Sequence, residues 1–138
     1  MSVPIGAGAI VSTPSDVTKF ANALFDGKII TNESLNLMKS MKDHYGYGLF
    51  EMPFGDKIGY GHTGGIDGFS SVYAYFPTEK IGFTLTSNGS NYNTNDISIV
   101  LLNVLFNNPY EIPSFKVYEL SSEDLDKYLG VYSSKDIP

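Results

Sequence analysis

The middle of the chain contains three short segments in close succession. Each segment is rich in β-branched and aromatic residues. They span residues 57–63, 69–76 and 81–87, and their composition favours β-strands. A glycine-rich stretch, 64–68, joins the first two, and a Pro-Thr-Glu-Lys turn, 77–80, joins the last two. Such short connections require antiparallel pairing, because a parallel crossover needs about a dozen residues. The sequence therefore predicts a three-stranded antiparallel meander.

A fourth strand is predicted just before the meander. Residues 45–49 read Tyr-Gly-Tyr-Gly-Leu, an alternation that indicates a strand over 45–52 with one glycine-rich face. The following Pro53-Phe54-Gly55-Asp56 is a turn signal.

Two helices are predicted before these strands. Over 12–27, Thr13 can cap the helix, Pro14 suits its first position, and Gly27 can end it. Its buried face follows the helical period and comprises Val17, Phe20, Ala21 and Leu24. A second helix is expected to start at Thr31, with apolar contacts from Leu35, Leu37, Met38 and Met41.

The last strong helix is predicted at residues 96–107. Apolar residues surround it almost completely, so we expect it to be largely buried. After Pro109 the chain is less organised, with one short helix expected from Ser122 to Tyr128.

Composition narrows the class of protein. The chain has 138 residues, of which 42% are apolar and 17% charged, as expected for one globular domain. Its net charge of −6 argues against a nucleic-acid partner. Absence of cysteine removes disulfides and thiolate catalysis, and no apolar run approaches the roughly 18 residues of a membrane span. Residues 1–11 carry no basic residue, so we expect no secretory signal there.

Residues 61–65 read Gly-His-Thr-Gly-Gly and form the candidate site. Glycines at the edge of a sheet let another backbone or a substrate come close. The same glycines could instead serve only the geometry of a turn.

Two other functional interpretations, dinucleotide binding and metal binding, are not favoured by the sequence. Gly59-x-Gly61-x-x-Gly64 matches a dinucleotide fingerprint in letters but is followed by a predicted strand rather than a helix. The two histidines, His44 and His62, lack the spacing of a metal site, so no metal and no cofactor is expected.

The order of these motifs resembles the serine β-lactamase and penicillin-binding family. A helix opening with Ser-Thr-Pro-Ser-Asp at residues 12–16 precedes the Tyr-Gly-Tyr-Gly-Leu segment. Then come His-Thr-Gly-Gly at 62–65, an aromatic strand, the 77–80 turn, and a strand that leads into Thr-Ser-Asn at 86–88. The resemblance covers residues 6–107. It is strongest to the branch that includes class C β-lactamases, D-alanyl-D-alanine carboxypeptidases, D-aminopeptidases and related esterases.

The resemblance implies roles for four residues. His62 would stand in place of the lysine in the family's Lys-Thr-Gly motif and would assist proton transfer or bind substrate charge. Thr63 would hydrogen-bond the substrate, and Gly64 would keep the strand accessible. The backbone N–H of Gly65 would be one donor of the oxyanion hole.

The family's nucleophile is missing from this sequence. No serine among the 138 residues has a lysine three positions later, so Ser-x-x-Lys is absent. The second family motif is absent as Tyr-x-Asn, and Ser34-Leu35-Asn36 matches the Ser-x-Asn form only within a predicted helix. Both motifs precede this region in the family. We therefore expect residues 1–108 to be the C-terminal portion of a β-lactamase-like domain.

Residues 109–138 are expected to form a linker and the start of an appended domain. The pattern Leu125-x-x-Tyr128-x-Gly130-x-Tyr132 resembles the opening of the small β-barrel-like domain found in many such hydrolases. The alternative is an amphipathic helix capped by Gly130, and the sequence leaves both open.

The expected fold is thus α+β, with an antiparallel sheet of three to four strands covered by helices, an incomplete β-lactamase/transpeptidase-like fold. An unpaired sheet edge is expected at 81–87, and with it self-association. The leading functional hypothesis is part of a serine hydrolase acting on an amide, β-lactam or ester, inactive alone. The first alternative is a non-catalytic module that binds a peptide or cell-wall fragment, and the second is a purely structural domain. The family implies a periplasmic, cell-envelope or secreted location, which the sequence itself leaves open.

Overall fold

The computed structural model describes residues 8, 10–89, 92–114 and 119–132, and these form four helices and four strands. The strands make one antiparallel sheet in chain order, so the predicted α+β class and the meander are confirmed. The elements are α1 (Pro14–Phe25), α2 (Asn32–Met38), β1 (Phe50–Phe54), β2 (Lys57–Ile66), β3 (Phe69–Phe76), β4 (Ile81–Ser87), α3 (Thr94–Leu105) and α4 (Ser122–Asp126).

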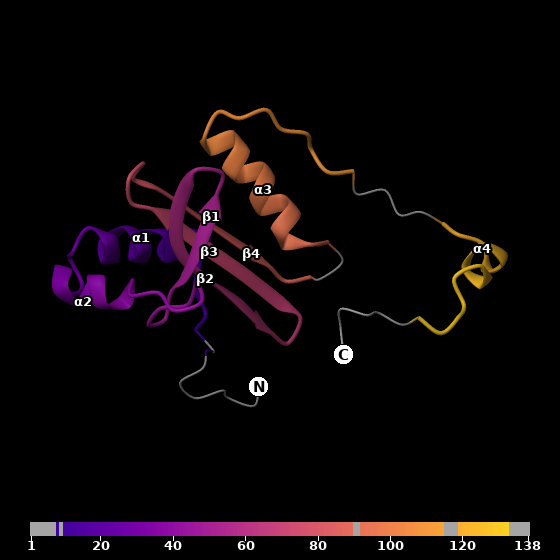
Figure 1. Cartoon of the computed structure of the whole chain (residues 1–138), viewed down its shortest axis with the longest axis horizontal. Helices are drawn as coiled ribbons and strands as arrows, with labels where there is room; N and C mark the ends of the chain where they lie inside the picture. The colour runs from indigo at the N-terminus through magenta and orange to yellow at the C-terminus, as the bar shows by residue number, and fades with distance from the viewer. Residues whose placement is uncertain (1–7, 9, 90–91, 115–118, 133–138) are drawn as a thin grey trace.

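Helices lie on both faces of the sheet (Figure 1). On one face, the ring of Phe25 at the end of α1 stacks on Tyr75 at 4.7 Å between centroids. On the other face, Phe106 after α3 contacts Phe76 edge-on at 5.0 Å. The main apolar cluster lies between the sheet and α3, and its buried members are Val72, Ala74, Phe76, Phe83 and Leu102.

Local capping signals set the starts of the first two helices as predicted. The side chain of Thr13 accepts a hydrogen bond from the backbone N–H of Asp16 at 3.2 Å, and Thr31 caps α2 in the same way. Gly27 adopts a φ of +70°, which suits the end of α1. The expectation that Met41 belongs to the second helix is wrong, because α2 ends at Met38.

The strand predicted at 45–52 lies further along the chain, at Phe50–Phe54. Residues 42–45 instead form a tight turn with positive φ at Asp43 and His44, and Tyr45 bridges back to Phe50. Pro53 lies in the strand rather than in the turn. It is tolerated because β1 is an edge strand and Pro53 occupies a position whose N–H would face away from β2.

The third helix is less buried than its composition predicts. It runs from Thr94 to Leu105, two residues earlier than expected, and only Ser98 and Leu102 are buried. Four of its apolar side chains are 37–46% exposed: Ile99, Leu101, Val104 and Leu105. The prediction of a largely buried helix is therefore wrong for this structure, because only one face of α3 meets the sheet.

The sheet ends at β4, which pairs only with β3 among the described strands, as expected for 81–87. The tail carries α4, whose cap is Ser121 and which has no buried residue. It lies well apart from the sheet in Figure 1. Residues 115–118 and 133–138 of the expected linker and appended domain lie outside the described residues. Within the described part, no helix combines the length and apolar character needed to cross a membrane.

Candidate functional site

Residues 62–65 of the candidate motif lie in the second half of β2, beyond the end of the neighbouring strand β1. The first residue of β1, Phe50, pairs with Gly61, while β2 continues to Ile66. Residues 62–66 are therefore flanked by a described strand only on the β3 side. The connection predicted at 64–68 is shorter than expected, since only Asp67 and Gly68 join β2 to β3. Residues 61–65 lie within β2 and not in the turn itself.

The register determines the direction of each main-chain amide. Asp67 and Gly68 both have positive φ and form a two-residue hairpin turn closed by Ile66 and Phe69. The closing pair of such a hairpin exchanges hydrogen bonds, and every second pair along the ladder does the same. Gly64 therefore faces Ser71 in a hydrogen-bonded pair, whereas the N–H of Gly65 points to the opposite side. That is the side beyond the end of β1.

The space beside the glycines differs along the motif. A Cβ on Gly61 would lie 1.9 Å from the carbonyl oxygen of Tyr73, so only glycine fits there. At Gly65 the nearest atom to such a Cβ would be the carbonyl oxygen of Phe69, at 4.0 Å. Gly61 is thus required by the packing of β2 on β3, while the surroundings of Gly65 are open.

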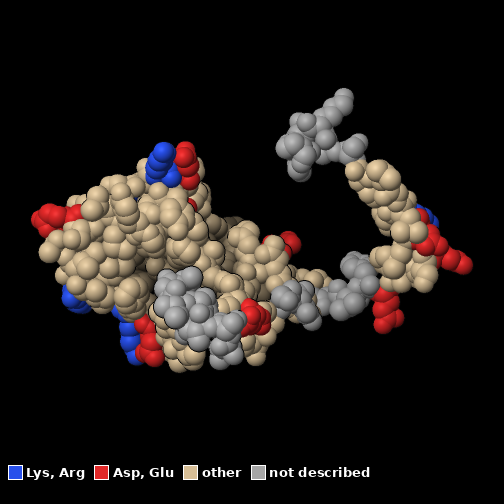
Figure 2. Space-filling view, turned by 90° about the horizontal axis from the view of Figure 1, so that it is seen from below, with Lys and Arg blue, Asp and Glu red and all other residues tan. Residues whose placement is uncertain are grey.

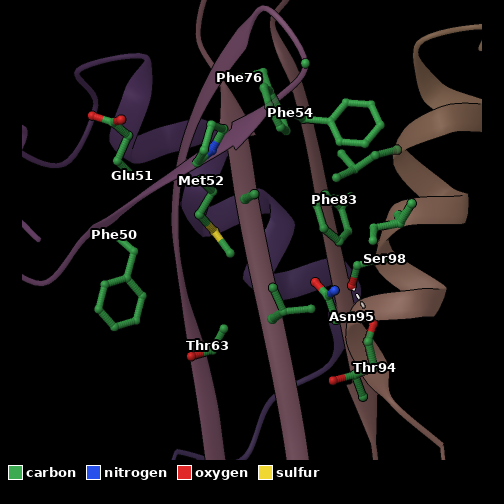
Figure 3. Close-up of a pocket in the computed structure, with 16 residues that line it drawn as sticks. Phe50, Glu51, Met52, Phe54, Thr63, Phe76, Phe83, Thr94, Asn95 and Ser98 are labelled. Atoms are coloured by element: carbon green, nitrogen blue, oxygen red, sulfur yellow. Dashed lines mark hydrogen bonds between the residues drawn. The ribbon is translucent and has the colours of Figure 1, made fainter. Parts of the chain in front are cut away.

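His62 and Thr63 project from opposite faces of β2, as successive strand residues do. Thr63 is exposed and lines a groove of about 640 Å³ between the sheet and α3. Figure 3 shows Thr63 and Phe50 near one end of that groove, with Ser98 and Asn95 of α3 across from them. The rest of the lining is mainly apolar, with Met52, Phe76 and Phe83 among its residues.

His62 is half-buried and contacts both backbone and rings. Its Nδ1 lies 2.5 Å from the carbonyl oxygen of Thr63, and its ring stacks on Phe50 at 4.2 Å between centroids. Its cross-strand partner is Tyr73, and burial raises the pKa of that phenol. The other histidine, His44, is exposed and lies 3.2 Å from the carboxylate of Glu51, so the structure does not bring the two histidines into one site.

The structure adds to the motif two residues that the sequence analysis did not connect with it. Phe50 contacts His62 directly, and the ring of Tyr45 lies edge-on at 6.3 Å. The only sequence feature that marks this segment is the alternation of aromatic and glycine residues at 45–49. That alternation indicates a strand and does not show that the segment contacts His62.

The chemistry available in the described residues is limited. They contain no group of three or more His, Asp or Glu side chains placed to hold a metal ion. Lysines stand singly on the face in Figure 2, and several pair with a neighbouring carboxylate, as Lys19 does with Asp16. The site thus offers main-chain donors, a hydroxyl and an imidazole, a set suited to binding a polar acyl group and moving a proton.

The sequence profile of the Beta-lactamase family matches residues 1–104. The chain therefore belongs to the β-lactamase family, and the predicted resemblance is confirmed. Among curated proteins there is no match.

Solved structures agree with this assignment. D-amino acid amidase from Ochrobactrum anthropi SV3 complexed with L-phenylalanine amide is 30% identical, with a TM-score of 0.59 over 70% of this chain and 33% of the amidase. Another structure of that amidase is 28% identical, with a TM-score of 0.59 over 67% of this chain and 34% of the amidase. The octameric penicillin-binding protein homologue from Pyrococcus abyssi shares the fold at 24% identity and a TM-score of 0.59, over 68% of this chain and 24% of its own. The chain thus spans about a third of the amidase.

Proposed function

We propose that this chain provides the substrate-binding strand and one oxyanion-hole donor of a serine hydrolase that works through an acyl-enzyme. The single observation that supports this most is the direction of the Gly65 N–H, away from β3 and beyond the end of β1. A donor held there by a rigid strand can stabilise charge developing on a carbonyl oxygen, by about 3 kcal/mol. Thr63 would bind the substrate, Gly64 would leave it room, and His62 would carry a proton.

The nucleophile would come from a segment outside these 138 residues, because no Ser-x-x-Lys is present in them. The chain alone is therefore expected to be inactive. Similarity to an amidase at 30% identity makes an amino-acid amide the first substrate class to test, ahead of a β-lactam or an ester. A burst of product from the purified chain with any of these substrates would overturn the claim of inactivity.

A chimera tests the role of the strand. Residues 10–107 of this chain would replace the matching region of the Ochrobactrum anthropi amidase, whose remaining part would supply the nucleophile. With D-phenylalanine amide as substrate, Gly65→Pro should lower kcat by about 100- to 1,000-fold, because it removes the N–H. Gly65→Ala keeps the N–H and has space for a methyl group, so it serves as the matched control. Equal activity of the two variants would refute the oxyanion role.

A non-catalytic binding module is the second candidate, and the same open edge favours it. A strand with unpaired main-chain groups can accept an extended peptide as an added strand. Calorimetric titration of the chain with a D-Ala-D-Ala peptide separates the candidates. Saturable binding in the micromolar range would favour the module, and no binding would favour a partial hydrolase.

Self-association forms part of the proposal. Among the described strands, β4 has no partner on its outer side. It contains no charged residue and no proline, the residues that discourage an edge strand from pairing with a second copy. We propose that the β4 strand of a second copy of the chain pairs with this edge.

A further inference from the structure

Three aromatic rings meet at the site: Tyr45, Phe50 and His62, here called the ring cluster. Phe50 stacks on His62 with 23° between the planes, and Tyr45 meets Phe50 edge-on at 4.7 Å. The ring of Tyr45 also lies edge-on to His62, at 78°. Offset-stacked and edge-to-face contacts of this kind are favourable arrangements of aromatic rings beyond the area that they bury. Each ring therefore restricts the rotation of the other two.

The contact of His62 with the backbone defines its protonation pattern. A carbonyl oxygen can only accept a hydrogen bond, so the Nδ1 that faces the Thr63 carbonyl must carry a proton. In a neutral imidazole the other nitrogen, Nε2, then has a free lone pair. The orientation of the ring thus decides which nitrogen of His62 can take a proton from a neighbouring group.

The segment that carries Tyr45 and Phe50 is anchored on both sides. Backbone hydrogen bonds join Gly46 to Leu49 at 2.8 Å, and the N–H of Tyr47 donates to the carbonyl of Met38 in α2 at 3.0 Å. Leu49 is fully buried. A ring on this segment can therefore act as a fixed wall against which the imidazole is held.

We propose that Phe50 is a positioning residue for His62, supported by Tyr45. Its ring holds the imidazole in the orientation that keeps Nδ1 bonded to the Thr63 carbonyl and leaves Nε2 as the proton acceptor. The use of that acceptor in acyl transfer rests on the proposed function, whereas the orientation itself does not.

The tautomer of His62 can be measured directly in the whole chain. In alkaline buffer, long-range proton–nitrogen NMR spectra of the ¹⁵N-histidine-labelled protein distinguish protonated from unprotonated ring nitrogens. His44→Gln removes the other histidine and assigns the signals. We expect His62 to carry its proton on Nδ1, and Phe50→Ala to convert it to an averaged mixture of the two tautomers. Phe50→Tyr keeps the stacked ring and should restore the original pattern.

The controls separate positioning from general loss of structure. Tyr47→Ala removes an exposed ring from the same segment, and the tautomer of His62 should be unchanged. If Phe50→Ala fails to fold, Phe50→Leu keeps apolar volume without a ring face and should still release the tautomer. A proton on Nε2 in the unmodified chain, or an unchanged tautomer in folded Phe50→Ala or Phe50→Leu, would overturn the proposal. The NMR experiment measures the tautomer of His62 and not enzymatic turnover. A failure of the proposed activity would therefore leave its result unaffected.

Discussion

At the scale of single residues, the proposed function depends on the direction of one main-chain amide. Proline at position 65 removes an N–H that the register directs away from β3, so no ladder hydrogen bond is lost and it should cost much less stability than proline at position 64. Proline at position 64 removes an N–H within the ladder and leaves its partner unbonded, so it should cost about 1–3 kcal/mol.

Urea unfolding of Gly64→Pro and Gly65→Pro measures that difference, and hydrogen exchange gives a second readout. The Gly65 amide should exchange rapidly and the Gly64 amide slowly. Equal losses of stability, together with protection of both amides, would mean that the Gly65 N–H is bonded within the sheet and unavailable to a substrate.

Tyr73, the cross-strand partner of His62, gives the fold a dependence on alkaline pH. Burial raises its pKa, so the folded state disfavours the ionised phenolate. Stability is then complete below the pKa of the unfolded chain, about 10, and is lost as the pH rises above that value. Tyr73→Phe should reduce this loss when thermal unfolding is followed from about pH 8 to 11. The exposed Tyr47→Phe is the control, and the same alkaline decline in both variants would contradict the assignment.

At the scale of elements, the turn between β3 and β4 contains a residue in an unfavourable conformation. Lys80 has a φ of +56°, a region where a side chain costs roughly 1–2 kcal/mol and where glycine is free of that cost. Lys80→Gly should therefore stabilise the fold by about 1 kcal/mol in urea unfolding. In the same turn Thr78 does not have a positive φ, so Thr78→Gly should give no gain. A loss of stability in Lys80→Gly would show that the lysine side chain stabilises the turn.

Elements governed by local chemistry could be predicted from the sequence. The caps at Thr13 and Thr31 need only residues within one helical turn. The turn between β3 and β4 is likewise determined by the four residues that form it. The start of β1 could not be found in this way. Tyr45 and Tyr47 have a strand pattern, but Asp43 and His44 turn the chain there, and the sheet begins only at Phe50, opposite Gly61.

The candidate site was predictable in part for the same reason. The motif at 62–65 is contiguous, so its letters identify it, and the family assignment is confirmed. Its setting depends on contacts between distant residues. The stacking of Phe50 on His62 brings together the start of β1 and the second half of β2, and no local pattern specifies that contact. The burial of α3 was overestimated because its composition does not show which faces find a partner within the chain.

At the scale of the whole molecule, we propose that residues 109–138 are separate from the domain formed by 1–108. None of the described residues after Asn108 is buried, and Tyr128 and Leu129 are 68% and 78% exposed. Residues that bury little apolar surface contribute little to the free energy of unfolding. Removing 109–138 should therefore leave the thermal unfolding temperature unchanged. A clear decrease would show that the tail packs on the domain.

The unpaired strand β4 governs how copies of the chain should interact. At alternate residues of this seven-residue strand the main-chain groups face away from β3, where no described strand pairs with them, and Thr86 is exposed within it. Lysine on an edge strand discourages pairing, because a buried ammonium group is costly and two copies repel each other. We expect the unmodified chain to form dimers or larger species in sedimentation as its concentration rises, and Thr86→Lys to shift it toward monomer. Thr78→Lys introduces the same charge in the exposed turn before β4 and should leave association unchanged. If both lysine variants dissociate equally, net charge rather than the β4 edge controls association. A stable monomer of the unmodified chain at high concentration would show that the β4 edge does not form a contact between copies.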